Sequence, residues 1–252
     1  MKALILAAGY ATRLYPYTKN FPKPLLEVNQ KPIIEYLTEK LEKLTGLSEI
    51  IVITNGRFYP YFEKWKKTVK TRKKIRIVND LTQSPEDRLG AIGDMNFVFG
   101  KLGFNDDYLV IGGDNFFKEP LAKFVSSAKK NYRAVTIGVC DIKKKSEARN
   151  YGVVTLDKNR RINEFWEKPA RPKSSLVAMC LYYFPASQVG FIREYLKNPA
   201  NHSDAAGAYI GWLTKNKNVR AVVFKNYWVD IGSIHTYEKV NKITKTKGVK
   251  AK

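Results

Sequence analysis

The feature that most constrains this chain is a succession of four strand signals, each followed by a helix signal, over residues 1–130. The first strand signal is the apolar run Lys2–Ala7, which Gly9 ends. A continuous apolar run of this length is typical of a strand that is buried on both faces. Strands that alternate with helices fold as a parallel sheet, because each helix crosses over the sheet in the right-handed sense. The pattern therefore predicts an α/β fold with a doubly wound sheet.

The other elements of this half are separated by glycine, proline and polar turns. In the first helix, Pro32 opens an apolar pattern that is spaced for one helix face, and Gly46 closes it. The later strand signals are Glu49–Thr54, Ile75–Val78 and Asp107–Ile111, and the later helix signals are Phe58–Val69, Leu89–Phe99 and Leu121–Lys130.

The second half changes to strands that follow one another closely, and the turn Asp157–Arg160 indicates a hairpin between two of them. We interpret the chain as one domain, residues 1–252, with an α/β lobe over 1–130, a mixed insert on the same sheet over 131–232, and a C-terminal helix with a basic tail over 233–252. The predicted strands are Ala134–Cys140, Tyr151–Leu156, Ile162–Trp166, Leu176–Phe184 and, as the last strand, Val219–Phe224. The predicted helices are Ser187–Leu196, Ala205–Leu213 and one that begins near Ile234.

The composition is that of a globular protein with an unusually large positive charge. The chain has 45 Lys and Arg against 23 Asp and Glu, so its net charge is 45 − 23 = +22. Such a charge attracts anions: nucleic acid, an anionic membrane face or phosphorylated small molecules. The longest apolar run is too short to cross a bilayer, and no secretory signal is present. Cys140 and Cys180 provide neither a disulfide framework nor a metal knuckle. We therefore expect a cytoplasmic protein with no membrane partner.

Several common functional fingerprints are missing from the sequence. It contains neither the P-loop pattern G-x-x-x-x-G-K-[ST] nor G-x-G-x-x-G after a strand, so a P-loop kinase and an NAD-binding enzyme are both disfavoured. The two histidines, His202 and His235, lack the H-E-x-x-H spacing of a zinc site. No G-x-S-x-G supports a serine triad either, and we expect both histidines to be surface residues.

The loop after the first strand carries the strongest candidate for chemistry. It comprises Leu6–Leu14, which reads LAAGYATRL, and Pro22–Leu26, which reads PKPLL. In open parallel sheets, ligands bind beyond the carboxyl ends of the strands, where a small-residue loop turns backbone N–H groups onto phosphate oxygens. Arg13 would supply a bidentate fork for phosphate, and Lys23 a point charge. The alternative is an ordinary strand exit with two solvated cations, and the joint spacing of the two segments favours a phosphate site.

These two segments resemble the signature L-A-A-G-x-G-T-R-L … P-K-P-L-L of the sugar-1-phosphate nucleotidyltransferases, which include the glucose-1-phosphate thymidylyltransferases. The resemblance implies a Rossmann-like mixed sheet of the nucleotide-diphospho-sugar transferase type, a nucleotide-binding lobe over 1–130 and a sugar-phosphate-binding lobe over 131–232. Ala11 stands where the family has a glycine, so the detailed geometry of the loop is left open. The residues that the resemblance assigns to the nucleotide in this loop are Leu6, Ala8, Gly9, Tyr10, Ala11 and Thr12.

Four further segments match the family in order: the sequences GGDN at 112–115, YGVV at 151–154, EFWEKP at 164–169 and WVDIGS at 228–233. The resemblance makes Asp114 and Asp230 the ligands of a Mg²⁺ cofactor, which prefers carboxylates together with substrate phosphates. Either aspartate alone could instead cap a helix. The residues assigned to the sugar phosphate are Asn115, Gly152, Glu167 and Lys168.

By themselves, Glu167 and Lys168 could be a surface ion pair of little consequence. Tyr151 and Trp166 are expected to be core or rim aromatics rather than substrate platforms.

Two segments depart from the family pattern. Many members read the base with a glutamine, whereas Asn79 or Asp80 occupies that place here, followed by Gly90 at the family's glycine. The identity of the base is therefore open. The segment Val177–Tyr182, which reads VAMCLY, lacks the asparagine and glycine of the family's A-N-x-G-I-Y. The sugar contacts of that segment are therefore not transferred.

The resemblance implies an enzyme that joins a nucleoside triphosphate and a sugar-1-phosphate, its two small-molecule partners, into a nucleotide sugar and pyrophosphate. Arg13 would stabilise the departing pyrophosphate, Lys23 the reacting α-phosphate and Lys168 the incoming sugar phosphate. Two alternatives are a non-catalytic regulatory subunit with this fold and a basic nucleic-acid-binding protein. The basic segment Lys64–Arg76 prompts the second, but we interpret it as a solvated helix face and turn, and nucleic acid is not an expected partner. The oligomeric state is open, a homo-oligomer included, and a second, acyltransferase domain is not expected.

Overall fold

The structure, a computed structural model, describes residues 1–248, with side chains described up to residue 243. Its largest sheet has nine strands in the described part of the chain, with β10-β9-β11-β6-β1-β4-β5 as the main path and β8 and β12 beside it. The parallel half consists of β1 (Lys2–Leu6), β4 (Glu49–Thr54), β5 (Lys74–Asn79) and β6 (Tyr108–Gly112). Because β1 lies between β4 and β6, its residues Ala3, Leu4 and Ile5 are fully buried, as the apolar run predicts.

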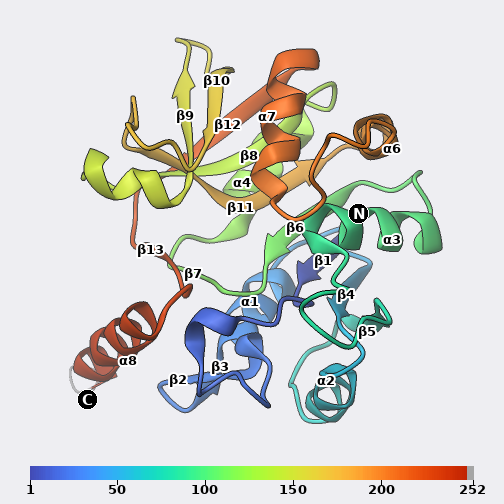
Figure 1. Cartoon of the computed structure of the whole chain (residues 1–252), viewed down its shortest axis with the longest axis vertical. Coiled ribbons are helices and arrows are strands. Elements are labelled where there is room, and N and C mark those ends of the chain that lie inside the picture. The colour runs from blue at the N-terminus through green and yellow to red at the C-terminus, as the bar shows by residue number, and fades with distance from the viewer. Residues whose placement is uncertain (249–252) are drawn as a thin grey trace.

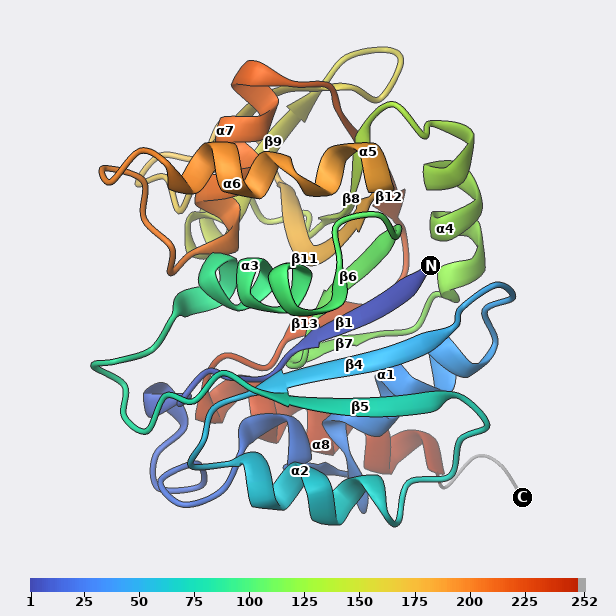
Figure 2. The same cartoon turned by 90° about the vertical axis from the view of Figure 1, so that its right-hand side faces the viewer.

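Helices cover both faces of this sheet, so the doubly wound prediction is confirmed (Figures 1 and 2). On one face, α1 (Ile33–Glu42), α2 (Tyr59–Lys66) and α4 (Leu121–Lys130) pack against one set of alternate strand residues, including Ile5 and Val52. On the other face, α3 (Gly90–Leu102) packs against the remaining set, including Leu4 and Ile51. Two cores of apolar side chains thus hold the sheet rigid, and its carboxyl edge is left for loops.

The second lobe extends the same sheet. It consists of β8 (Val135–Asp141), β9 (Gly152–Leu156), β10 (Ile162–Glu167), β11 (Leu176–Phe184) and β12 (Val219–Phe224), with α5 (Ala186–Val189), α6 (Phe191–Leu196) and α7 (Ala206–Asn216). β11 joins the lobes, because it pairs antiparallel with β6 on one side and with β8 and β9 on the other. β9 and β10 form the predicted hairpin. The helix predicted over Ser187–Leu196 is two helices, separated at Gly190.

Several short elements were not predicted from the sequence. β2 (Glu27–Val28) pairs with β3 (Lys31–Pro32), and β7 (Asn115–Phe117) pairs with β13 (Trp228–Asp230). The prediction that Val219–Phe224 is the last strand is therefore wrong. A strand of two or three residues is too short to display an alternating pattern, and its existence depends on its partner.

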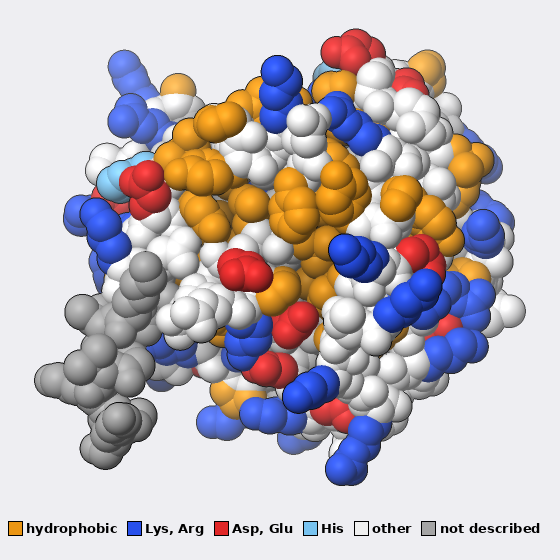
Figure 3. Space-filling view, turned by 90° about the horizontal axis from the view of Figure 1, so that it is seen from below, with side chains coloured by type: hydrophobic (Ala, Val, Ile, Leu, Met, Phe, Trp, Pro, Cys, Tyr) orange, Lys and Arg blue, Asp and Glu red, His pale blue; other side chains and the backbone are white. Residues whose placement is uncertain are grey.

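The C-terminal helix α8 (Ile234–Gly248) includes much of the segment predicted as a basic tail, and residues 249–252 of that tail lie outside the described residues. The other basic segment, Lys64–Arg76, spans the end of α2 and the start of β5. Its one aromatic residue, Trp65, is buried and donates from Nε1 to Glu35 at 3.0 Å. On the face seen in Figure 3, hydrophobic side chains gather in the middle, and Lys and Arg are scattered among Asp and Glu. The burial of Trp65 agrees with a solvated helix face at this segment.

Candidate active site

The loop after β1 takes the conformation that the glycine of the family pattern would favour. Ala11 has φ 50° and ψ 42°, which is the left-handed region. Its carbonyl oxygen accepts hydrogen bonds from Leu14 N at 2.9 Å and from Thr18 Oγ1 at 2.8 Å. The bond from Leu14 N closes the 3₁₀ turn Thr12–Leu14, which contains Arg13. The Ala11 substitution therefore keeps the turn, at the cost of a Cβ in a region that disfavours one.

A cavity of about 470 Å³ opens beside this loop, at the carboxyl ends of β1 and β6. Of the residues predicted to bind the nucleotide, all but Asn79 line it, and so do Arg13, Lys23 and Asp114. Asn79 instead accepts a hydrogen bond from Leu81 N at 2.8 Å, which fixes the turn after β5. Of the two candidates for the base-reading position, the structure therefore brings Asp80 and not Asn79 to the cavity.

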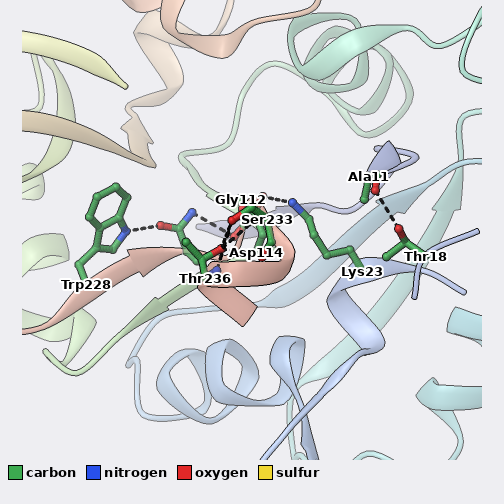
Figure 4. Close-up of polar contacts among 9 residues, drawn as sticks. Ala11, Thr18, Lys23, Gly112, Asp114, Trp228, Ser233 and Thr236 are labelled. Carbon is green, nitrogen blue, oxygen red and sulfur yellow. Dashed lines mark hydrogen bonds and ion pairs between the residues drawn. The ribbon is translucent and has the colours of Figure 1, made fainter. Parts of the chain in front are cut away.

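The two predicted metal ligands meet because β7 pairs with β13. In that pairing Asp230 lies opposite Asn115, and Ile231 N donates to Asp114 O at 3.1 Å. Residues 114 and 230 are thus brought side by side. Trp228 Nε1 donates to Asn115 Oδ1 at 2.7 Å, which fixes the Asn115 amide (Figure 4). Helix α8 is capped by Ser233, whose Oγ accepts from Thr236 N at 3.2 Å, so the capping alternative for Asp230 is wrong.

Lys23 and Asp114 form an ion pair at the junction of loop and sheet. Lys23 Nζ lies 2.5 Å from Asp114 Oδ2, and the Lys23 side chain is only 15% exposed (Figure 4). Burial alone would raise the pKa of Asp114, but the charge and hydrogen bond of Lys23 hold it below the ordinary value. Burial would likewise lower the pKa of Lys23, and the carboxylates of Asp114 and Asp230 raise it. Both partners are therefore charged at neutral pH.

Asp230 is in a different electrostatic state from Asp114. Burial and the neighbouring negative charge of Asp114 raise the pKa of Asp230 to about 7. Its Oδ1 is buried and has no hydrogen-bond partner among the described residues. A buried carboxylate oxygen without a donor is costly unless a ligand supplies the missing charge. Asp230 thus has a free acceptor for a cation.

A second cavity, of about 230 Å³, lies on the other side of this aspartate pair. All the residues predicted for the sugar phosphate line it, together with Asp114 and Asp230: they are Asn115, Gly152, Glu167 and Lys168. Asp114, Ala91 and Cys180 line both cavities, so the two adjoin. Arg13 therefore lines one cavity and Lys168 the other, and Asp114 lies where the two cavities adjoin.

Two glycines leave the space that the Glu167 carboxylate occupies in the second cavity. A Cβ on Gly207 would lie 1.8 Å from Glu167 Oε2, and one on Gly152 would lie 3.2 Å from the same atom. Lys168 has φ 44°, and its N donates to Tyr151 O at 3.1 Å, so the chain turns sharply after β10. Lys168 Nζ is 3.9 Å from Glu167, and its side chain is 58% exposed, which leaves the ammonium free to move to a phosphate.

Other lining residues of the two cavities were not found from the sequence. Cys180, with φ 50° at a break in the β8–β11 register, stands where the family pattern has glycine. Tyr151, expected in the core or at the rim, lines the second cavity and packs against Trp228. Asp94 and Asp204 line the first cavity. Asp94 carries a weak signal, since it is a charged residue among the apolar residues in the middle of α3, and it is 5% exposed.

Arg88, Gly90 and Asp204 bring the two lobes together over the first cavity. Arg88 Nε and Nη2 each lie 3.1 Å from the Asp204 carboxylate. Ala91 N donates to Asp204 O at 3.1 Å, and Ile92 N to Ser203 O at 2.9 Å. The segment 203–204 therefore crosses from the second lobe onto the start of α3. Gly90, with φ +77°, is the point of closest approach.

Among the described residues, no group of three or more His, Cys, Asp or Glu side chains could hold a metal by itself. Cys140 and Cys180 are both free. The described helices include none that is both long and apolar enough to pass through a membrane.

Comparison with known proteins relates the whole chain to one family. The chain is 31% identical over 237 residues to the bifunctional protein GlmU of Methanococcus aeolicus, covering 92% of this chain and 51% of that protein. It is also 31% identical over 243 residues to a bifunctional sugar-1-phosphate nucleotidylyltransferase/acetyltransferase of Sulfurisphaera tokodaii, covering 96% and 55%. The chain thus spans about half the length of these relatives.

Among solved structures, UDP-glucose pyrophosphorylase complexed with UDP-glucose superposes with a TM-score of 0.80 at 22% identity, and the match covers 98% of each chain. This likeness confirms the fold. The sequence profile described as nucleotidyl transferase matches residues 2–247. The chain therefore belongs to the nucleotidyl transferase family.

Proposed function

We propose that this protein transfers a nucleoside monophosphate from a nucleoside triphosphate to a sugar-1-phosphate, giving a nucleotide sugar and pyrophosphate. The observation that carries the proposal is the pair of adjoining cavities that meet at Asp114, each with a cationic side chain facing it. Such an arrangement holds two phosphorylated substrates with their reacting groups close together. Relatives named as sugar-1-phosphate nucleotidylyltransferases support the same reaction.

The reaction needs positioning and charge neutralisation more than covalent chemistry from the protein. An oxygen of the sugar phosphate attacks the α-phosphorus, and pyrophosphate leaves in line with it. The attacking oxygen is already anionic, so no general base is required. Repulsion between the two phosphates is the main obstacle. Arg13 would stabilise the departing pyrophosphate, and Lys168 would hold the incoming sugar phosphate. Lys23, which is held by Asp114, would face the α-phosphate.

The aspartate pair fits a magnesium site. Mg²⁺ prefers carboxylate oxygens and substrate phosphates to a cage made only of protein groups. Asp230 supplies a buried oxygen without a partner, and Asp114 lies beside it. We therefore assign Asp114 and Asp230 as the residues that would hold Mg²⁺. When bound, this ion would neutralise phosphate charge at the point where the two substrates meet.

The alternative functions lack a supporting observation. A regulatory subunit would be marked by degenerate catalytic positions, but Arg13, Lys23, Asp114, Lys168 and Asp230 are all present. For the basic segment Lys64–Arg76 to bind nucleic acid, it would need an exposed aromatic residue among its basic residues, and its one aromatic residue, Trp65, is buried. We also propose a cytoplasmic location, because free cysteines without a disulfide fit a reducing compartment.

The decisive experiment measures pyrophosphate release for a matrix of nucleoside triphosphates and sugar-1-phosphates with Mg²⁺. In the best pair, Arg13→Ala, Lys168→Ala and Asp230→Asn should each lower kcat/KM by ~10²–10³-fold, because each removes a charged group from the transition state. Lys173→Ala is a matched control, since Lys173 is an exposed lysine near Lys168 in sequence, paired at 3.8 Å with Glu164. Near-wild-type release from the three site variants would refute the assignment.

A further inference from the structure

Two buried carboxyl groups lie together in the nucleotide cavity, where the family pattern has an amide side chain for the base. Asp80 follows β5 and is 4% exposed, and Asp94 belongs to α3 and is 5% exposed. Both line the cavity, and Asp80 is near enough for its negative charge to act on Asp94. Asp94 has no assigned role in the transfer reaction proposed above. Asp80 has only its place at the base-reading position of the family pattern.

The orientation of Asp80 is fixed by its neighbours. Its Oδ1 accepts hydrogen bonds from Thr82 N at 2.8 Å and from Thr82 Oγ1 at 2.9 Å. The Tyr10 hydroxyl lies 3.2 Å from the same Thr82 Oγ1. Asp80 Oδ1 is therefore already hydrogen-bonded within the protein. Asp80 Oδ2 and Asp94 Oδ1 are buried and have no N–H or O–H partner in the described part of the chain.

The pair holds one proton near neutral pH. Burial raises the pKa of Asp80, and burial together with the negative charge of Asp80 raises the pKa of Asp94 to about 8. Two neighbouring carboxyls do not both ionise readily, so Asp94 keeps its proton near neutral pH while Asp80 can ionise. The pair consequently carries one negative charge, and Asp80 Oδ2 and Asp94 Oδ1 have lone pairs without a partner in the described part of the chain.

No cation of the described residues neutralises this charge. Arg88, which lines the same cavity, is engaged by both oxygens of Asp204 and also donates to Pro85 O at 2.6 Å. Neither Asp80 nor Asp94 has an ion pair with lysine or arginine within residues 1–243. The cavity thus contains a buried, negatively charged hydrogen-bond acceptor, which is best matched by a neutral donor on the ligand.

Nucleobases differ in whether they can supply that donor. Cytosine, adenine and guanine each carry an exocyclic amino group, whereas uracil and thymine present carbonyl oxygens on both sides of one N–H. A carbonyl facing the ionised carboxylate of the pair would place acceptor against acceptor. An amino group would donate to the ionised carboxylate, and the proton on Asp94 can face a ring nitrogen of cytosine or adenine.

We propose that Asp80 and Asp94 read the base and select a nucleoside triphosphate with an exocyclic amino group over UTP and dTTP. This inference rests on the proposed function, since it assumes that the larger cavity takes the nucleoside triphosphate. The specificity-determining residues would thus be an acid pair in place of the amide of the family pattern.

Binding is measured by calorimetric titration of the full chain with CTP, ATP, GTP, UTP and dTTP in Mg²⁺, without any sugar phosphate. We expect the best amino-bearing triphosphate to bind at least about tenfold more tightly than UTP and dTTP, as a good hydrogen-bond match discriminates bases by about that much. Equal or tighter binding of UTP or dTTP overturns the proposal, as does the absence of binding by all five.

Variants test whether the pair causes the selection. Asp80→Asn, and the double variant Asp80→Asn with Asp94→Asn, should reduce the binding ratio at least about tenfold, because the site then presents amide donors to the base. Asp106→Asn is the matched control: it removes a carboxylate outside the cavity that is paired with Lys2 at 2.7 Å, and the ratio should not change. An unchanged ratio in folded variants of the pair would overturn the proposal. If they do not fold, the wild-type series decides it.

The turnover matrix separates this inference from the proposed reaction. Selective binding of amino-bearing triphosphates without pyrophosphate release would refute the transfer activity and leave base selection intact. Rapid pyrophosphate release with UTP or dTTP as the best substrate would support the transfer activity and refute base selection.

Discussion

Replacement of Gly90 by alanine should detach the segment 203–204 from the start of α3. Gly90 has φ +77°, where a Cβ is strained, and that Cβ would lie 2.5 Å from Asp204 Cα and 2.6 Å from Ser203 O. Both neighbours are backbone atoms, which cannot turn aside as the end of a side chain could. Either the backbone of α3 moves or the two hydrogen bonds from Ala91 N and Ile92 N to this segment break.

The expected magnitude follows from these terms. The left-handed conformation costs alanine ~1–2 kcal/mol, and overpacking against fixed atoms costs ~1–3 kcal/mol. Relief by breaking the two hydrogen bonds costs ~0.5–1.5 kcal/mol for each. Alanine also lowers the conformational entropy of the unfolded chain, which offsets the loss of stability by ~0.4–1 kcal/mol. Since clash and bond loss are alternatives, we expect the free energy of unfolding of Gly90→Ala to fall by about 2–4 kcal/mol.

Urea unfolding followed by circular dichroism measures this change, and hydrogen exchange at the Ala91 and Ile92 amides reports whether the segment has detached. Gly100→Ala is the matched control in the same helix, because a Cβ there has nothing within 4 Å and alanine should stabilise the helix by ~0.5–1 kcal/mol. A Gly90→Ala protein within ~0.5 kcal/mol of wild type, with both amides protected as before, would refute this account of the close approach.

Three further predictions concern single side chains. Burial raises the pKa of Asp94 in the folded protein to about 8, above its unfolded value, so its contribution to stability is lost as pH rises from ~4 to ~8. Asp94→Asn should therefore raise Tm relative to wild type more at pH ~8.5 than at pH ~5.5. An equal difference in Tm at both pH values would contradict the burial of an uncharged acid. Ala11→Gly should raise the free energy of unfolding by up to ~1 kcal/mol in urea titrations, because it relieves the left-handed alanine; a loss of stability would show that the turn tolerates the Cβ without strain. Gly207→Ala would place its Cβ 1.8 Å from Glu167 Oε2, so the Glu167 carboxylate must turn away. KM for the sugar phosphate should therefore rise at least ~10-fold with little change in Tm. An unchanged KM would exclude Glu167 from sugar binding.

The amino-acid sequence by itself determined the elements that are buried on both faces or have strong helical periodicity. The bounds of Glu49–Thr54, Leu121–Lys130, Leu176–Phe184 and Val219–Phe224 agree with the structure to the residue. Burial of this kind leaves a local pattern, because successive residues of a strand or helix face known directions. The sequence motifs likewise located most of the side chains that line the two cavities.

The tertiary structure alone decided which distant segments meet. Asp114 and Asp230 lie together because three-residue strands, β7 and β13, pair across the molecule. Asp94 lines the first cavity because α3 packs on the sheet face beside β1, and the same packing brings it near Asp80. Asp204 reaches Arg88 only because β11 joins the second lobe to β6. Local patterns record whether a residue is buried, whereas the partner that it meets depends on the path of the whole chain.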